Sequence, residues 1–95
     1  MAPVITGFRH QSLKRFFESG DARDLQPNHV PKIRRILTQL HAAAMVSDLS
    51  APGLRLHPLK GARAGEWAVD VDRNWRITFR LDKRDCDAIN YKDYH

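Results

Sequence analysis

Residues 66–81 read EWAVDVDRNWRITFRL, and this stretch decides the fold class. Apolar residues recur at every second position on both sides of a short polar link, residues 72–74. Successive side chains of a β-strand point to opposite faces of the sheet, so this period of two predicts two strands that each bury one face. The short link predicts that they form an antiparallel hairpin. We expect Trp67 and Trp75 in the core, because each begins an alternating apolar set.

Shorter strand patterns lie on either side of the hairpin. Residues 54–59 predict a strand that bends or ends near Pro58, because proline cannot donate to a strand ladder. Residues 88–91 predict a further strand after a charged turn at residues 82–85. The apolar pair at residues 4–5 predicts a short first strand.

Two helices are predicted between the first strand and the others. Residues 11–19 carry apolar side chains at helical spacing, and Gly20 is placed to end that helix in a left-handed conformation. Residues 30–44 carry a second apolar stripe, with Asn28 as the expected N-cap and Pro31 in the first turn. The order of elements predicts one α+β domain over residues 1–95, with two helices on one face of a mainly antiparallel sheet.

Composition narrows the choice of partners and of compartment. Sixteen Lys and Arg against eleven Asp and Glu give a net charge of +5, which suggests a polyanionic partner. Cys86 is the only cysteine, so neither an intramolecular disulfide nor a Cys-rich zinc site can form. We expect a cytoplasmic protein without a signal peptide and without contact with a membrane.

Cations and histidines gather on the sheet face that turns away from the predicted core. Arg76 and Arg80 alternate with the apolar residues of the hairpin, and Arg55 shares a parity with His57 on the preceding strand. Lys60 follows at the end of that strand, and it can join His57 only if the chain turns between them. Arginine grips phosphate oxygens, and histidine is suited to proton transfer near neutral pH. This pattern predicts a face that binds and polarises a phosphodiester.

Other chemistries lack their motifs. The sequence has no HExxH, no phosphate-binding glycine loop and no nucleophile elbow, so we expect neither a metal site nor a cofactor. The three histidines outside the basic face, His10, His29 and His41, are expected to be structural.

Three motifs resemble those of one protein family. They are LHPLKG at residues 56–61, NWRITF at residues 74–79 and YKDYH at residues 91–95. Together, in this order and spacing, they are similar to the HigB branch of the RelE superfamily, the toxins of type II toxin–antitoxin systems. The resemblance covers essentially the whole chain.

The resemblance implies a RelE-like fold and metal-independent cleavage of mRNA in the A site of the 70S ribosome. It also implies a HigA-type helix-turn-helix antitoxin as partner. The toxin would then be bound to DNA only indirectly, through this antitoxin. The family's active-site positions correspond to His57, Lys60, Arg76, Asp93, Tyr94 and His95. Further RNA contacts are expected from Arg55, Arg80 and Lys92.

Attack of a ribose 2′-hydroxyl on the adjacent phosphorus is the expected mechanism. His95, oriented by Asp93, is the first choice for the general base and His57 for the general acid, although the two roles could be exchanged. Lys60 and Arg76 would neutralise the phosphoryl oxygens. Tyr94 would position the base or the phosphate.

Two other functions remain open at this point. A toxin of the same superfamily that binds a protein target such as DNA gyrase would share the fold, but that branch lacks the Asp-Tyr-His set at residues 93–95. A non-catalytic RNA-binding domain would need no pair of histidines.

Overall fold

The computed structural model describes residues 4–42, 55–82 and 85–93. The elements are β1 Val4–Ile5, α1 Gln11–Ser19, the 3₁₀ helix η1 Pro27–His29, α2 Val30–Ala42, β2 His57–Pro58, the 3₁₀ helix η3 Gly61–Arg63, β3 Glu66–Asp70, β4 Trp75–Asp82 and β5 Asp85–Asp93. Residues 43–44, the end of the second predicted helix, lie outside the described residues. None of the described helices is long and apolar enough to cross a membrane.

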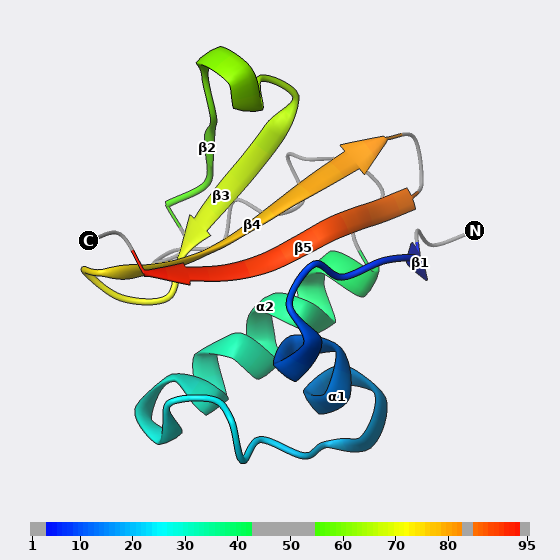
Figure 1. The fold of residues 1–95 in the computed structure, drawn as a ribbon, viewed down its shortest axis with the longest axis vertical. Coiled ribbons are helices and arrows are strands. Elements are labelled where there is room, and N and C mark those ends of the chain that lie inside the picture. Colours follow the sequence, from blue (N-terminus) through cyan, green and yellow to red (C-terminus); the bar gives the residue numbers. More distant parts are fainter. Residues whose placement is uncertain (1–3, 43–54, 83–84, 94–95) are drawn as a thin grey trace.

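The described strands form one sheet in the order β1-β5-β4-β3-β2. The pairs from β5 to β2 are antiparallel, and only β1 runs parallel to its neighbour β5. Both α-helices lie on the same side of this sheet (Figure 1). The predicted α+β class, with two helices on one face of a mainly antiparallel sheet, is confirmed.

The core lies between the helices and the sheet. Alternation along β3 and β4 turns Val69, Ile77 and Phe79 toward the helices, where each is fully buried. The helices contribute the apolar stripes that their sequences predicted, including Leu13 and Ile33. Trp67 and Trp75 pack against this cluster from its border and are only partly buried. The prediction that both tryptophans pack in the core is confirmed, because both contact the core cluster, although neither is fully buried.

The two helix starts differ from each other. His10 caps α1, because its side chain accepts a hydrogen bond from the backbone N–H of Leu13 at 3.3 Å. The predicted N-cap Asn28 of the second helix is wrong, since residue 28 lies inside η1, which begins after Gln26 and continues into α2. Pro27 explains the difference, because its fixed φ suits the first helical position and starts the helical path earlier. Pro31 lies in the first turn of α2, as predicted.

Gly20 ends α1 in the left-handed region with φ 79°, and its N–H bonds to the carbonyl of Phe16 at 2.8 Å. We expect Gly20→Ala to destabilise the protein by about 1–2 kcal/mol, because a Cβ is strained in this conformation. No atom lies within 4 Å of the position that the new Cβ would take, so the loss arises from the backbone alone. Thermal melting measures it, and an unchanged melting temperature would contradict this account of the cap.

β5 is longer than its sequence predicted because a bulge interrupts its alternation. Thr78 pairs with Asn90 and Arg80 pairs with Asp87, so β5 contains one residue more than β4 between these two pairs. Ala88 takes up the extra residue with φ 56°. Such a bulge breaks the period of two that predicts a strand. Only residues 88–91 keep a recognisable pattern, whereas the ladder runs from residue 85 to residue 93.

β2 is shorter than predicted and consists of His57 and Pro58. It ends at the proline, as expected, and the chain then turns through η3, which starts at Gly61 with φ 69°. Arg55 has φ 52° and is not part of a strand. The prediction that Arg55 and His57 share a strand parity is therefore wrong, and their proximity has another cause.

Candidate active site

The sheet face that is turned away from α1 and α2, called here the outer face, carries the polar members of each strand. Paired residues in antiparallel strands share a face, so the register places His57, Ala68, Thr78 and Asn90 in one row across it. Asp70, Arg76 and Lys92 form the next row. The sequence prediction that Arg76 and Arg80 lie opposite the core is confirmed by this register.

A hollow of about 550 Å³ opens beside these two rows. It is lined by Arg55, Leu56, His57, Asp70 and Arg73. Among the described residues, two arginines and one imidazole thus surround a space open to solvent, together with one carboxylate. Arg76 is half-buried on the strand beside Asp70, its register partner. The hollow and its border therefore combine cations with a group that can exchange protons.

His57 has a defined orientation. Its Nδ1 lies 2.7 Å from the backbone carbonyl of Arg55. A carbonyl can only accept, so Nδ1 must carry a proton, and Nε2 is left as the nitrogen that binds or releases a proton. The neutral ring offers a lone pair at Nε2 and the cationic ring offers an N–H there. Either form suits acid–base chemistry.

Arg55 holds His57 through its unusual backbone. The left-handed φ of 52° is uncommon outside glycine, and here it accompanies the bond from the Arg55 carbonyl to the ring two residues later. The Arg55 side chain is largely exposed and reaches Asp70, with Nε 3.4 Å from Oδ2. The structure thus brings Arg55 and His57 together by a local turn and not by strand parity.

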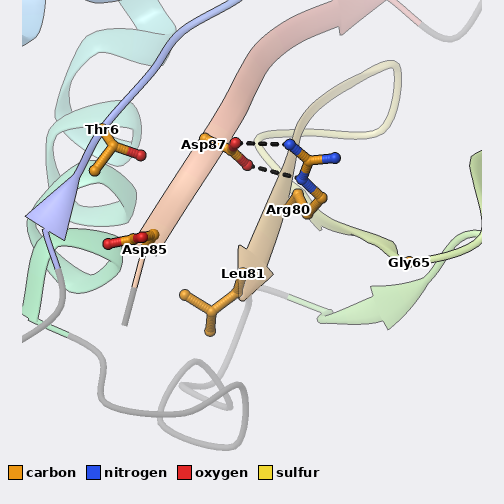
Figure 2. Close-up of a pocket in the computed structure, with 6 residues that line it drawn as sticks. All are labelled: Thr6, Gly65, Arg80, Leu81, Asp85 and Asp87. Carbon is orange, nitrogen blue, oxygen red and sulfur yellow. Dashed lines mark hydrogen bonds and ion pairs between the residues drawn. The ribbon is translucent and has the colours of Figure 1, made fainter. Parts of the chain in front are cut away.

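Arg80 lies at the other end of the outer face, in a different environment. Its Nε and Nη2 donate to the two carboxylate oxygens of Asp87 at 3.0 and 2.8 Å. Figure 2 shows this paired contact between β4 and β5 beside a second hollow, which is lined also by Thr6, Gly65 and Asp85. The bond from Arg80 holds the pKa of Asp87 below its usual value, so the carboxylate stays charged. Arg80 is therefore a charge-balanced part of the face, whereas the hollow at His57 has an excess of cations.

Lys60 and Asp93 lie apart from this hollow. Lys60 is exposed at the start of η3 and is not among the residues that line the hollow. Asp93 pairs with Trp75, so it belongs to the row on the helix side, whereas its neighbour Lys92 pairs with Arg76 on the outer face. The sheet therefore does not bring Asp93 onto the same face as Arg76. Tyr94 and His95 lie outside the described residues.

The structure adds residues that sequence reasoning did not select. Asp70 and Arg73 line the hollow. Asp70 could have been found from the sequence, because the alternation of the predicted hairpin places it on the same face as Arg76. The three remaining histidines have structural contacts, as predicted: His10 caps a helix, His41 accepts from the backbone N–H of Ile5 at 3.4 Å, and His29 is buried. No feature of the sequence indicated the partners of His29, which come from distant segments.

Two further chemistries find no support in the part of the chain that the structure describes. Burial raises the pKa of the Cys86 thiol to about 12, so this cysteine is a core residue and not a nucleophile. Within residues 4–42, 55–82 and 85–93, no three His, Cys, Asp or Glu side chains are grouped to hold a metal ion. The groups that the hollow offers for chemistry are therefore its imidazole and its guanidinium cations.

Comparison with known proteins now identifies the family. The family described as the RelE-like toxin of the type II toxin–antitoxin system HigB has a model that matches residues 6–95. The chain belongs to the HigB-like toxins. A curated relative, "Endoribonuclease HigB" of Proteus vulgaris, is 38% identical over 92 residues, which cover 97% of this chain and 100% of that protein. The resemblance inferred from the three sequence motifs is thereby confirmed.

A solved structure supports the fold independently of the sequence. The YoeB/ParE toxin from Agrobacterium tumefaciens matches with a TM-score of 0.61 over 100% of both chains, at 17% sequence identity. This likeness shows that the HigB-like chain has the RelE-like fold, as the motifs had implied.

Proposed function

We propose that this HigB-like toxin is a ribosome-dependent endoribonuclease that cleaves translated mRNA and so inhibits translation and growth. The orientation of His57 carries the proposal: its Nδ1 is tied to the Arg55 carbonyl, so Nε2 is the nitrogen that can exchange a proton at the edge of the cationic hollow. The 38% identity with a protein named an endoribonuclease supports the same activity. We propose further that residues 1–95 are one toxin domain that acts in the cytoplasm.

The proposed reaction uses a nucleophile from the RNA itself. The 2′-oxygen forms a bond to phosphorus while the bond from phosphorus to the 5′-oxygen breaks, and a 2′,3′-cyclic phosphate results. His95 takes the proton of the 2′-hydroxyl, and His57 gives one from Nε2 to the leaving oxygen. Because the substrate supplies the nucleophile, no metal-bound water is needed.

The remaining residues of the proposed site act on charge and position. Arg76 and Lys60 neutralise the phosphoryl oxygens as negative charge grows on them. Asp93 orients His95, and Tyr94 stacks on a base or holds the phosphate. Arg55 and Lys92 bind RNA phosphates. Arg80 also binds a phosphate, while its guanidinium group stays paired with the Asp87 carboxylate. The ribosome contributes by holding the mRNA in a reactive geometry.

The proposed partners follow from the family. A type II toxin is paired with an antitoxin, and we propose a HigA-type helix-turn-helix protein, which would also provide the only contact with DNA. Purification of the chain together with the product of its neighbouring gene tests this partnership. Isolation of a free monomer that does not slow growth would contradict it.

Cleavage should depend on translation and not on a transition metal. We expect purified toxin to cut mRNA on programmed 70S ribosomes and to leave the same RNA intact when ribosomes are absent. The expectation rests on the small hollow, which offers few groups to bind and bend free RNA. Mapping of 5′ ends measures the cuts, and a chelator selective for transition metals leaves the Mg²⁺ of the ribosome in place.

Three outcomes of this assay separate the alternatives. Equal cutting of naked RNA would overturn the dependence on the ribosome. Loss of cutting in the chelator, restored by one transition metal, would overturn the metal-free mechanism. Binding without any cut would favour a non-catalytic RNA-binding domain.

A further inference from the structure

A chain of hydrogen bonds, buried at His29 and Tyr91 and exposed at Asp72, joins three distant segments on the helix side of the sheet. His29 of η1 is 2% exposed. Its Nδ1 meets the hydroxyl of Tyr91 on β5 at 2.5 Å, and its Nε2 meets Oδ2 of Asp72, in the link between β3 and β4, at 2.6 Å. Asp72 and Tyr91 are 43 and 62 positions from His29 in the sequence, so only the tertiary fold brings the three together.

The hydrogen bond between Asp72 and His29 has a fixed direction. The hydrogen bond from His29, followed by one from the backbone of Asn74, holds the pKa of Asp72 below its usual value. Asp72 is therefore a carboxylate and can only accept, so Nε2 of His29 donates. Burial raises the pKa of Tyr91 to about 12, so its phenol is neutral. The Tyr91 hydroxyl can donate to Nδ1 of His29 or accept from it, so both ring nitrogens have a partner.

The same residues fix the ends of the two central strands. Oδ1 of Asp72 accepts from the backbone N–H groups of Asn74 and Trp75 at 2.8 and 2.9 Å, which closes the turn between β3 and β4. The Trp75 ring stacks on Tyr91 with 4.5 Å between the ring centres. Trp75 also pairs with Asp93, two residues beyond Tyr91. The start of β4 and the end of β5 are thus held to η1 by one connected set of contacts.

These strand ends carry residues of the proposed active site. Arg76 follows Trp75 on β4, and Lys92 and Asp93 follow Tyr91 on β5. An apolar side chain at position 29 would fill the same space, but it would not fix the direction of the Tyr91 hydroxyl or of the Asp72 carboxylate. A polar network in which every member is hydrogen-bonded favours a single arrangement of the groups that it joins.

We infer that His29 is a positioning residue: through Tyr91 and Asp72 it fixes the ends of β4 and β5, and so the placement of Arg76 and Asp93. This inference rests on the proposed nuclease function, because it assigns the network a part in that reaction. His29 does not touch the RNA. Displacement of catalytic groups by about 1 Å can reduce a rate by about 100-fold, so a network of this kind is sufficient to control activity.

Asp72→Asn tests the inference with little change in shape. Two backbone N–H groups keep the amide oxygen in the place of Oδ1, so the amide nitrogen turns its N–H toward Nε2 of His29. Nε2 of His29 must then accept, so the ring proton lies on Nδ1 and is donated to the Tyr91 hydroxyl. We expect ¹⁵N NMR of the imidazole to report loss of the proton from Nε2, kcat for cleavage on programmed ribosomes to fall by about 10–100-fold, and KM to change by less than about threefold.

Tyr91→Phe is the second variant, because it keeps the ring that stacks on Trp75 and removes only the hydroxyl. We expect a similar loss of kcat. Asp21→Asn is the matched control: this partly exposed carboxylate also accepts a backbone N–H, from Arg23 at 3.1 Å, but it lies in the connection between α1 and η1. Its cleavage rate should equal that of the wild type.

A double-mutant cycle shows whether the network acts through the proposed site. In an Arg76→Ala background, Asp72→Asn should cause much less further loss of kcat than in the wild type, because both changes then act through Arg76. Full additivity would overturn the inference, and so would wild-type kcat in both network variants. A loss that only matches the unfolded fraction from thermal melting would reduce His29 to a structural residue. If the wild type itself does not cleave translated mRNA, the proposed function fails instead, while the tautomer measurement still tests the network.

Discussion

Removal of Tyr94 and His95 abolishes cleavage of translated mRNA while the protein stays folded: this is the largest effect that we expect. Loss of a proton-transfer group typically lowers a rate by about 10²–10⁴-fold, and the deletion removes the proposed general base together with the residue that positions the RNA. The last ladder pair of β5 joins Asp93 to Trp75, so the deletion takes away no described contact of the sheet or the core. Cleavage on programmed ribosomes and thermal melting are the two measurements.

Single substitutions distinguish chemistry from folding in this experiment. His95→Ala alone should cause most of the loss in rate. His41→Ala is the control, since His41 is an exposed imidazole on α2 whose hydrogen bond goes to the backbone of β1. Normal cleavage by the shortened protein would remove these residues from the active site, and a large fall in melting temperature would make them part of the structural framework.

Arg76→Ala should lower the cleavage rate by about 10²–10³-fold, the usual cost of removing one oriented group that stabilises charge in a transition state. Arg76 is half-buried on the outer face, with Asp70 and Lys92 as its register partners on either side. The strand itself is held by its neighbour Ile77, which is fully buried in the core. Melting should therefore change far less than the rate.

Arg76→Lys refines this prediction. A lysine keeps the charge but has no planar fork for two phosphate oxygens, so its rate should lie between those of the wild type and Arg76→Ala. Arg35→Ala, on the exposed side of α2, removes the same type of side chain away from the proposed site and should not alter cleavage. If Arg76→Ala unfolds the protein at the assay temperature, or cleaves normally, Arg76 has no catalytic part.

Much of the site could be predicted from sequence because it lies on regular strands. Alternation in residues 66–81 is sufficient to place Arg76 and Arg80 on one face, and the strand register confirms that placement. Prediction failed where the backbone leaves that regularity. The left-handed Arg55 does not obey strand parity, and the bulge at Ala88 hides the first half of β5 from a period of two.

The ion pairs of the arginines were less predictable from the sequence than the sheet face on which the arginines lie. A basic composition could not show that Arg80 is bound by Asp87 while Arg55, His57 and Arg73 line an open hollow, because ion pairs depend on which strands become neighbours. The same reason applies to Asp93. The family resemblance implied that Asp93 belongs to one site with Arg76, but pairing with Trp75 sets it on the other side of the sheet.

The sequence by itself determined the helices, the hairpin and the family, because those depend on local periodicity and on motifs that are contiguous in the chain. Only the tertiary structure decided which nitrogen of His57 can exchange a proton, since that depends on one hydrogen bond made by a left-handed turn. It also decided the role of His29. A buried imidazole needs partners for both nitrogens, and folding supplies them from Asp72 and Tyr91, which lie far from His29 in the sequence.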